Sequence, residues 1–141
     1  LDSETRTYVE ETGGANVLFV KADGTLVVPK SHTDSILPSI TRRSLVQVAK
    51  DLGMNVEERF VEWAEVASGA FVECGLCGTA AVISPVGQID NKVYGANEEV
   101  TFPNGKDEIG PVMKKLRETL TGIQNGALED KHGWVCKIDV D

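Results

Sequence analysis

Two short stretches of the chain combine residue types that can hold an anion. Residues 35–42, with the sequence SILPSITR, lead into a helical pattern for which Thr41 is a natural N-cap. The free amides and the dipole at a helix start favour negative charge, yet Arg42 and Arg43 occupy this first turn. A bound phosphate would remove that conflict. The alternative is that both arginines point into solvent or pair with acids elsewhere.

The second stretch, residues 77–81, consists mainly of small side chains. Small residues let a ligand approach the backbone closely, and the Thr79 hydroxyl can donate or accept a hydrogen bond. A crowded β-bulge packed against a neighbouring element would have the same composition, so the residues alone leave both interpretations open. Two anion-holding turns on one chain suggest a phosphorylated cofactor together with a carboxylate substrate.

Cys74 and Cys77 form a CxxC pattern, for which two chemical roles must be weighed. A structural zinc site needs a second pair of ligands at motif spacing, and Cys136, His32 and His132 are not so spaced. A thiol-redox motif should open a helix, whereas the residues that follow favour a turn and a strand. We therefore expect small buried thiols and no metal site, with a redox or zinc module as the alternative.

Glu10 and Glu11 precede an apolar strand. As a default they are a solvated pair of acids, but a buried carboxylate with a partner could hold a proton on a heterocyclic nitrogen. His32 and His132 are isolated from any Ser or Cys nucleophile, so a hydrolase triad has no support. The chain has neither a GxGxxG nor a Walker motif.

Composition sets the broad class. The 141 residues suit one domain with a real core, and an apolar content of 41% suits a soluble globular chain. A net charge of −8 argues against nucleic-acid binding, and no apolar run approaches the roughly 20 residues of a membrane span.

An odd number of cysteines favours a reducing compartment, hence the cytoplasm. The chain lacks an initiator Met, so an organellar address could lie in a missing N-terminal part.

The elements that must position these residues follow from the apolar pattern. We expect strands at 16–20, 26–28, 56–61, 70–74, 80–86 and 99–102, the first two forming a hairpin. We expect helices from Thr41 to Gly53, over 62–67, and from Pro111 to Gly126. The tail from Glu129, which carries Trp134, is expected to dock on the body. The fold class is therefore mixed α/β (α+β), with a largely antiparallel sheet flanked by helices.

Taken together, these stretches resemble the branched-chain amino acid aminotransferases, pyridoxal-phosphate enzymes of fold type IV. The likeness covers nearly the whole chain, and its motifs stand in the family's order. The matching segments are 8–19 (YVEETGGANVLF), 35–42, 77–86 (CGTAAVISPV), Gly110-Pro111, and the C-terminal pieces 120–124 and 129–134. Ser39 stands where the family usually has Gly, so this position needs a compatible backbone angle or some strain.

The resemblance implies a barrel-like sheet and roles for individual residues. Glu11 would face the pyridine nitrogen of pyridoxal 5′-phosphate and keep it protonated, and Glu10 would be the solvated acid. Leu37 would pack on the ring. The remaining residues would bind a phosphate or a carboxylate through backbone amides or small side chains. They are Ile40 and Thr41 for the phosphate, Thr79 and Ala80 for phosphate or substrate carboxylate, and Gly14 for substrate.

The resemblance also implies an activity. The enzyme would transfer the amino group of leucine, isoleucine or valine to 2-oxoglutarate, as a cytoplasmic homodimer acting on branched-chain amino acids and 2-oxo acids. Residues 1–141 would be its C-terminal cofactor-binding domain. The family's Schiff-base lysine lies upstream of the Glu11 segment, so we expect no catalytic residue in this chain and no transamination by the chain alone.

Three rival interpretations stay open on the sequence. A D-amino acid aminotransferase or an aminodeoxychorismate lyase would share the fold. A non-catalytic domain could retain the fold for protein interaction, and the thiol-redox or zinc module is the third. The redox CxxC of some animal members of the family falls at Ala81 and Ser84 here, so that switch does not transfer.

Overall fold

The strands pair into one five-stranded and one two-stranded sheet in a computed structural model that describes residues 1–93, 97–104 and 108–138. The larger sheet has the order β3-β2-β1-β4-β5, and only its β2–β3 pair is parallel. The smaller sheet is the antiparallel pair β6–β7. The strands are β1 (Asn16–Lys21), β2 (Leu26–Pro29), β3 (Val56–Arg59), β4 (Phe71–Gly78), β5 (Val82–Pro85), β6 (Gln88–Asn91) and β7 (Glu98–Thr101).

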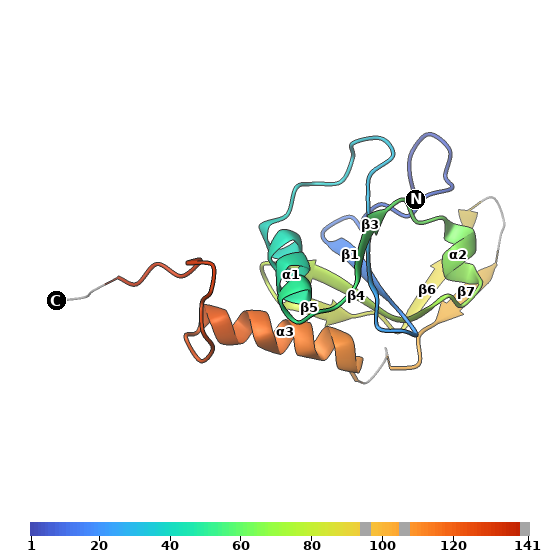
Figure 1. The fold of residues 1–141 in the computed structure, drawn as a ribbon. Coiled ribbons are helices and arrows are strands. Elements are labelled where there is room, and N and C mark those ends of the chain that lie inside the picture. The colour runs from blue at the N-terminus through green and yellow to red at the C-terminus, as the bar shows by residue number, and fades with distance from the viewer. Residues whose placement is uncertain (94–96, 105–107, 139–141) are drawn as a thin grey trace.

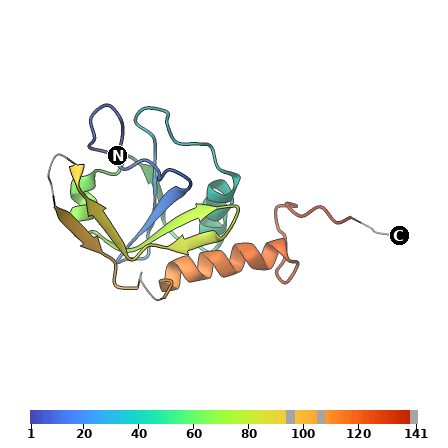
Figure 2. The same cartoon turned by 180° about the vertical axis from the view of Figure 1, so that it is seen from behind.

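In the described ranges, three helices flank the sheets (Figures 1 and 2). α1 (Ile40–Asp51) and α3 (Pro111–Gln124) pack on one face of the five-stranded sheet and against each other. The short α2 (Trp63–Ala67) lies beside β7. None of the helices in the described part is long and apolar enough to cross a membrane.

Alternation along the central strand β1 divides the core into two clusters. Leu18 and Val20 face α1 and α3, whereas Val17 and Phe19 face the opposite side. Phe19 stacks on Phe71 there, with ring centroids 4.7 Å apart. Because successive side chains of a strand point to opposite faces, a single apolar strand can serve both clusters.

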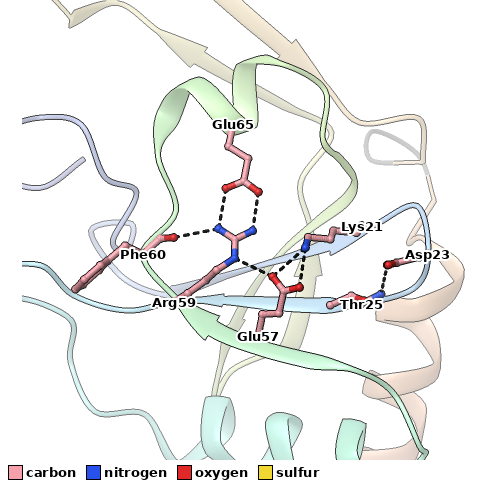
Figure 3. A network of polar contacts seen from close by, with 7 residues as sticks. All are labelled: Lys21, Asp23, Thr25, Glu57, Arg59, Phe60 and Glu65. Atoms are coloured by element: carbon pink, nitrogen blue, oxygen red, sulfur yellow. Dashed lines mark hydrogen bonds and ion pairs between the residues drawn. The ribbon is translucent and has the colours of Figure 1, made fainter.

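A network of polar contacts lies at β3, an edge strand of the five-stranded sheet (Figure 3). Arg59 binds Glu65 of α2 with both terminal nitrogens, at 2.8 and 2.6 Å, and its Nε donates to Glu57. Glu57 also accepts from Lys21 of β1 at 2.7 Å. The hydrogen bonds to Glu65 hold the pKa of Arg59 above its ordinary value. The network therefore joins β1, β3 and α2 through charged groups that are only partly exposed.

A buried carboxylate from the sheet holds the start of α3. The N-cap residue Gly110 has no side chain to offer. In its place Glu73 of β4 accepts the amides of Val112 and Met113, at 3.1 and 2.9 Å. Negative charge at a helix N-terminus is favourable, so Glu73 fixes α3 on the sheet across some 39 residues of sequence.

The expected fold class is confirmed: the chain is mixed α/β, mostly antiparallel, and flanked by helices. The sheets curve (Figure 2), but the five-stranded sheet is open, with β3 and β5 at its edges. The expectation of a docked tail is only partly right. His132 bonds Asp51 of α1 at 2.6 Å and stacks on Trp134, while the last described part of the tail leads away from the body (Figure 1).

Candidate functional site

The first turn of α1 is capped by Ser39 and not, as the sequence predicts, by Thr41. The Ser39 side chain accepts the Arg42 amide at 3.1 Å, and its carbonyl accepts the Arg43 amide at 3.1 Å. Ser39 reaches the third helical amide because its own backbone is extended, with φ −110° and ψ 125°. That conformation is ordinary for any residue, so serine replaces the family's usual glycine without strain.

Two amides at this helix start remain free. Within the described residues, no acceptor binds the backbone N–H of Ile40 or of Thr41. The first turn contains no acid. Arg42 turns back toward the body, with Nη1 3.5 Å from the Pro29 carbonyl and a buried Nε that has no acceptor there. Free amides, the helix dipole and an unsatisfied guanidinium nitrogen together favour an anion at this end of α1.

The start of α1 borders a cavity of about 350 Å³. Five of the predicted site residues line it, from three separate parts of the chain: Gly14, Glu11, Leu37, Ile40 and Thr79. The other two predicted residues are not among its lining. Thr41 is buried in the first turn of α1, and Ala80 is exposed in the turn that follows Thr79.

Glu11 is half-buried in this cavity and held through one carboxylate oxygen. Its Oε2 accepts the Asn16 side-chain amide at 2.7 Å and the Leu37 backbone amide at 3.2 Å. No hydrogen bond to its Oε1 comes from the part of the chain that the structure describes. One oxygen is thus anchored, while the other is available to a proton donor.

Asn16 is a cavity residue that the sequence analysis missed. It is buried at the start of β1, bonds Glu11, and leaves its Oδ1 without a partner among the described residues. Asn16 could have been found from the sequence, because it is a polar residue at the start of an apolar strand. A buried polar atom without a partner is costly, so its presence beside the cavity is consistent with a polar ligand.

Glu10 is buried, and the expectation that it is the solvated acid is wrong. Hydroxyls and amides of residues 31–35 converge on its carboxylate. Burial alone would raise the pKa of Glu10, but the hydrogen bonds from Ser35, Ser31, Thr33 and His32 together lower it from 4.5 to about 2. The donors come from a loop more than 20 residues away, which the local sequence cannot reveal.

The turn between β4 and β5 is strained. Val82 has φ 59°, and the Ile83 amide bonds the Ala81 carbonyl at 2.7 Å, as in a γ-turn. A β-branched residue at positive φ is an outlier and costs about 1–3 kcal/mol. The predicted strand over 80–86 therefore begins only at Val82, and residues 79–81 form the turn that brings Thr79 to the cavity.

Cys74 and Cys77 do not form a thiol pair. Three positions apart on β4, they enter opposite core clusters, Cys74 the one that contains Phe71 and Cys77 the one that contains Leu18. Burial raises the pKa of Cys74 to about 12 and that of Cys77 to about 11. No group of three or more His, Cys, Asp or Glu side chains that could hold a metal occurs among the described residues.

Thiol reactivity tests this arrangement. In native protein at pH 8 we expect the exposed Cys136 to be alkylated, while Cys74 and Cys77 react only after unfolding, because the thiolate is the reactive species. Peptide mapping by mass spectrometry after iodoacetamide treatment measures each site. Modification of Cys74 and Cys77 at the rate of Cys136, or a disulfide between them, would contradict the structure.

Comparisons of the sequence and of the structure lead to one family. Residues 3–89 match the family described as amino-transferase class IV. The branched-chain-amino-acid aminotransferase of Mycobacterium tuberculosis is 44% identical over 145 residues, covering 98% of this chain and 38% of the relative. The structure of the Escherichia coli branched-chain amino acid aminotransferase matches with TM-score 0.74 and 34% identity, over 92% of this chain and 38% of that one.

A second similar solved structure is named as a cofactor-bound form. The branched-chain amino acid aminotransferase from Thermobaculum terrenum, described as the PLP-form or holo-form, matches with TM-score 0.66 and 33% identity. The match covers 84% of this chain and 34% of that one. The chain thus spans well under half the length of the relatives that it matches.

Proposed function

The chain belongs to the amino-transferase class IV family, and we propose that residues 1–141 are the C-terminal cofactor-binding domain of a branched-chain amino acid aminotransferase. The observation that carries the proposal is the shared cavity. Its lining includes Ile40, at the helix start with free amides, together with Glu11 and Thr79. The relatives supply the reaction class, since they are branched-chain aminotransferases.

Residues that line the cavity, together with Thr41 and Ala80 next to Ile40 and Thr79 in the chain, would fit pyridoxal 5′-phosphate. A phosphate would be held by the amides of Ile40 and Thr41, by the Thr41 hydroxyl and by the favourable dipole of α1. Leu37, 72% exposed at the cavity, would cover the ring. The turn with Thr79 and Ala80 would hold either the phosphate or the substrate carboxylate. An organic ring between a phosphate site and a carboxylate would account for all these groups.

The Glu11 carboxylate would keep a proton on the ring nitrogen. When bound, the cofactor supplies the electron sink for the negative charge that develops at the amino acid's α-carbon. Asn16 and the Leu37 amide fix one oxygen of Glu11, so the carboxylate does not have to be oriented during turnover. Gly14, beside it, leaves room for the substrate because no other group lies within 4 Å of where its Cβ would be.

The wider reaction is part of the same proposal. The complete enzyme would exchange amino groups between leucine, isoleucine or valine and 2-oxoglutarate, as a cytoplasmic homodimer. The lysine that bonds the cofactor would come from outside residues 1–141. The 141-residue chain alone would therefore be inactive.

An amino-donor assay of the complete enzyme tests the function. With 2-oxoglutarate as acceptor, we expect turnover of L-leucine, L-isoleucine and L-valine to exceed that of D-alanine at least about a hundredfold, since discrimination follows the contacts built for the true substrate. The separate 141-residue chain is the control and should give none. Preference for D-alanine, formation of 4-aminobenzoate from aminodeoxychorismate, or no bound cofactor would each contradict the proposal.

A further inference from the structure

Several hydrogen bonds of the loop that leads to the cavity converge on one buried group, the carboxylate of Glu10, beside ring contacts of His32 with Tyr8 and Phe60. Glu10 is 5% exposed. Its Oε1 accepts the Ser31 hydroxyl at 2.8 Å, the His32 amide at 2.8 Å and the Thr33 amide at 3.2 Å. Its Oε2 accepts only hydroxyls, those of Thr33 and Ser35. Four consecutive or near-consecutive loop residues are thus tied to a single side chain.

Among the described residues, few contacts hold the loop between Ser35 and the Ser39 cap of α1. Leu37 and Ile40 are 72% and 71% exposed, so side-chain burial contributes little to their order. The next hydrogen bond to the loop comes from the neighbouring acid, because Glu11 accepts the Leu37 amide at 3.2 Å. Segments with few buried contacts open at low cost unless hydrogen bonds fix them. Glu10 and Glu11 therefore supply the side-chain acceptors that constrain residues 35–38, ahead of the Ser39 cap of α1.

We propose that Glu10 is a positioning residue of the cofactor site, which orders residues 31–35 so that Leu37 and the amides of Ile40 and Thr41 meet the ligand. The inference rests on the proposed function for the identity of that ligand. Glu10 itself does not line the cavity. The two adjacent acids thus have different roles. Glu11 contacts the cofactor, and Glu10 positions the loop that completes the cofactor's pocket.

The two oxygens of Glu10 suggest a graded test with two variants. Glu10→Ala removes every acceptor. Glu10→Gln keeps a carbonyl for the two backbone amides on the Oε1 side, and the hydroxyls of Thr33 and Ser35 can rotate to accept from the new amide group. Alanine should therefore release the loop, and glutamine should largely rescue it.

The measurement is the dissociation constant of pyridoxal 5′-phosphate for the apo form of the complete enzyme, with amide hydrogen exchange of residues 31–40. If the released loop spends about a tenth of its time in the binding conformation, affinity falls about tenfold in Glu10→Ala, against less than about threefold in Glu10→Gln. The amides of His32 and Thr33 should lose protection in Glu10→Ala only. This second readout does not depend on activity.

Glu73→Gln is the matched control, because Glu73 is also a buried carboxylate with backbone donors but holds α3 and not the loop. It should lower the melting temperature without weakening cofactor binding. If Glu10→Ala does not fold, Ser35→Ala removes one donor at an exposed position and should weaken binding by about threefold.

Two results would separate the claims. Wild-type enzyme that fails to bind pyridoxal 5′-phosphate overturns the proposed function. Wild-type binding with affinity and loop protection unchanged in Glu10→Ala, or equal weakening in Glu73→Gln, overturns only the role of Glu10.

Discussion

Glu11→Gln is expected to lower the turnover of the complete enzyme about 10²–10³-fold, a loss of the size seen when one preorganised electrostatic group is removed. An amide cannot hold a proton on the ring nitrogen as a carboxylate does. Glutamine still offers an acceptor to Asn16 and to the Leu37 amide, so the cavity should keep its shape. The affinity for pyridoxal 5′-phosphate should therefore change far less than turnover.

Steady-state kinetics with L-leucine, alongside cofactor titration, separate these two effects. Glu58→Gln is the control, because Glu58 is an exposed acid on β3 away from the cavity. It should behave as wild type in both measurements. Full turnover in Glu11→Gln would exclude the ring-nitrogen role, and a loss of cofactor as large as the loss of turnover would assign Glu11 to binding alone.

Gly110→Ala is expected to destabilise the fold by about 2–4 kcal/mol, from overpacking together with lost hydrogen bonds to a buried carboxylate. The backbone of Gly110 is ordinary, with φ −60° and ψ 154°. Space is the constraint, because an added Cβ would overlap the carboxyl group of Glu73. Glu73 would have to move and release the amides of Val112 and Met113.

Urea unfolding of the complete enzyme, followed by circular dichroism, measures this effect. Gly13→Ala is the matched control, because no atom lies within 4 Å of a Cβ added there. Its free energy of unfolding should stay within about 0.5 kcal/mol of wild type. A Gly110→Ala protein as stable as the control would show that α3 does not depend on the Glu73 contact.

Local patterns were enough to predict much of this fold. The Asp23-Gly24 turn between two apolar runs predicts the β1–β2 hairpin, and Gly24 takes the positive φ of 85° that such a turn uses. Pro111 correctly marks the start of α3. These features depend on residues close together in the sequence, where turn chemistry and periodicity decide the outcome.

The errors concern contacts between distant residues. Glu10 reads as a solvated acid because its donors lie 21 to 25 residues away. Thr41 and Ser39 are equally good caps by type, and the choice depends on how the preceding loop enters α1. The buried positions of Cys74 and Cys77, by contrast, agree with the expectation from the sequence, and strand geometry sends the two thiols to opposite faces. The burial of Glu10 and the choice of cap depend on contacts that form only in the folded chain.

A crystal structure of the complete enzyme with pyridoxal 5′-phosphate would test the central claim most directly. We predict phosphate oxygens at about 3 Å from the amide nitrogens of Ile40 and Thr41, with the ring nitrogen facing Glu11. A phosphate bound elsewhere, with those two amides facing water or another part of the protein, would contradict the account.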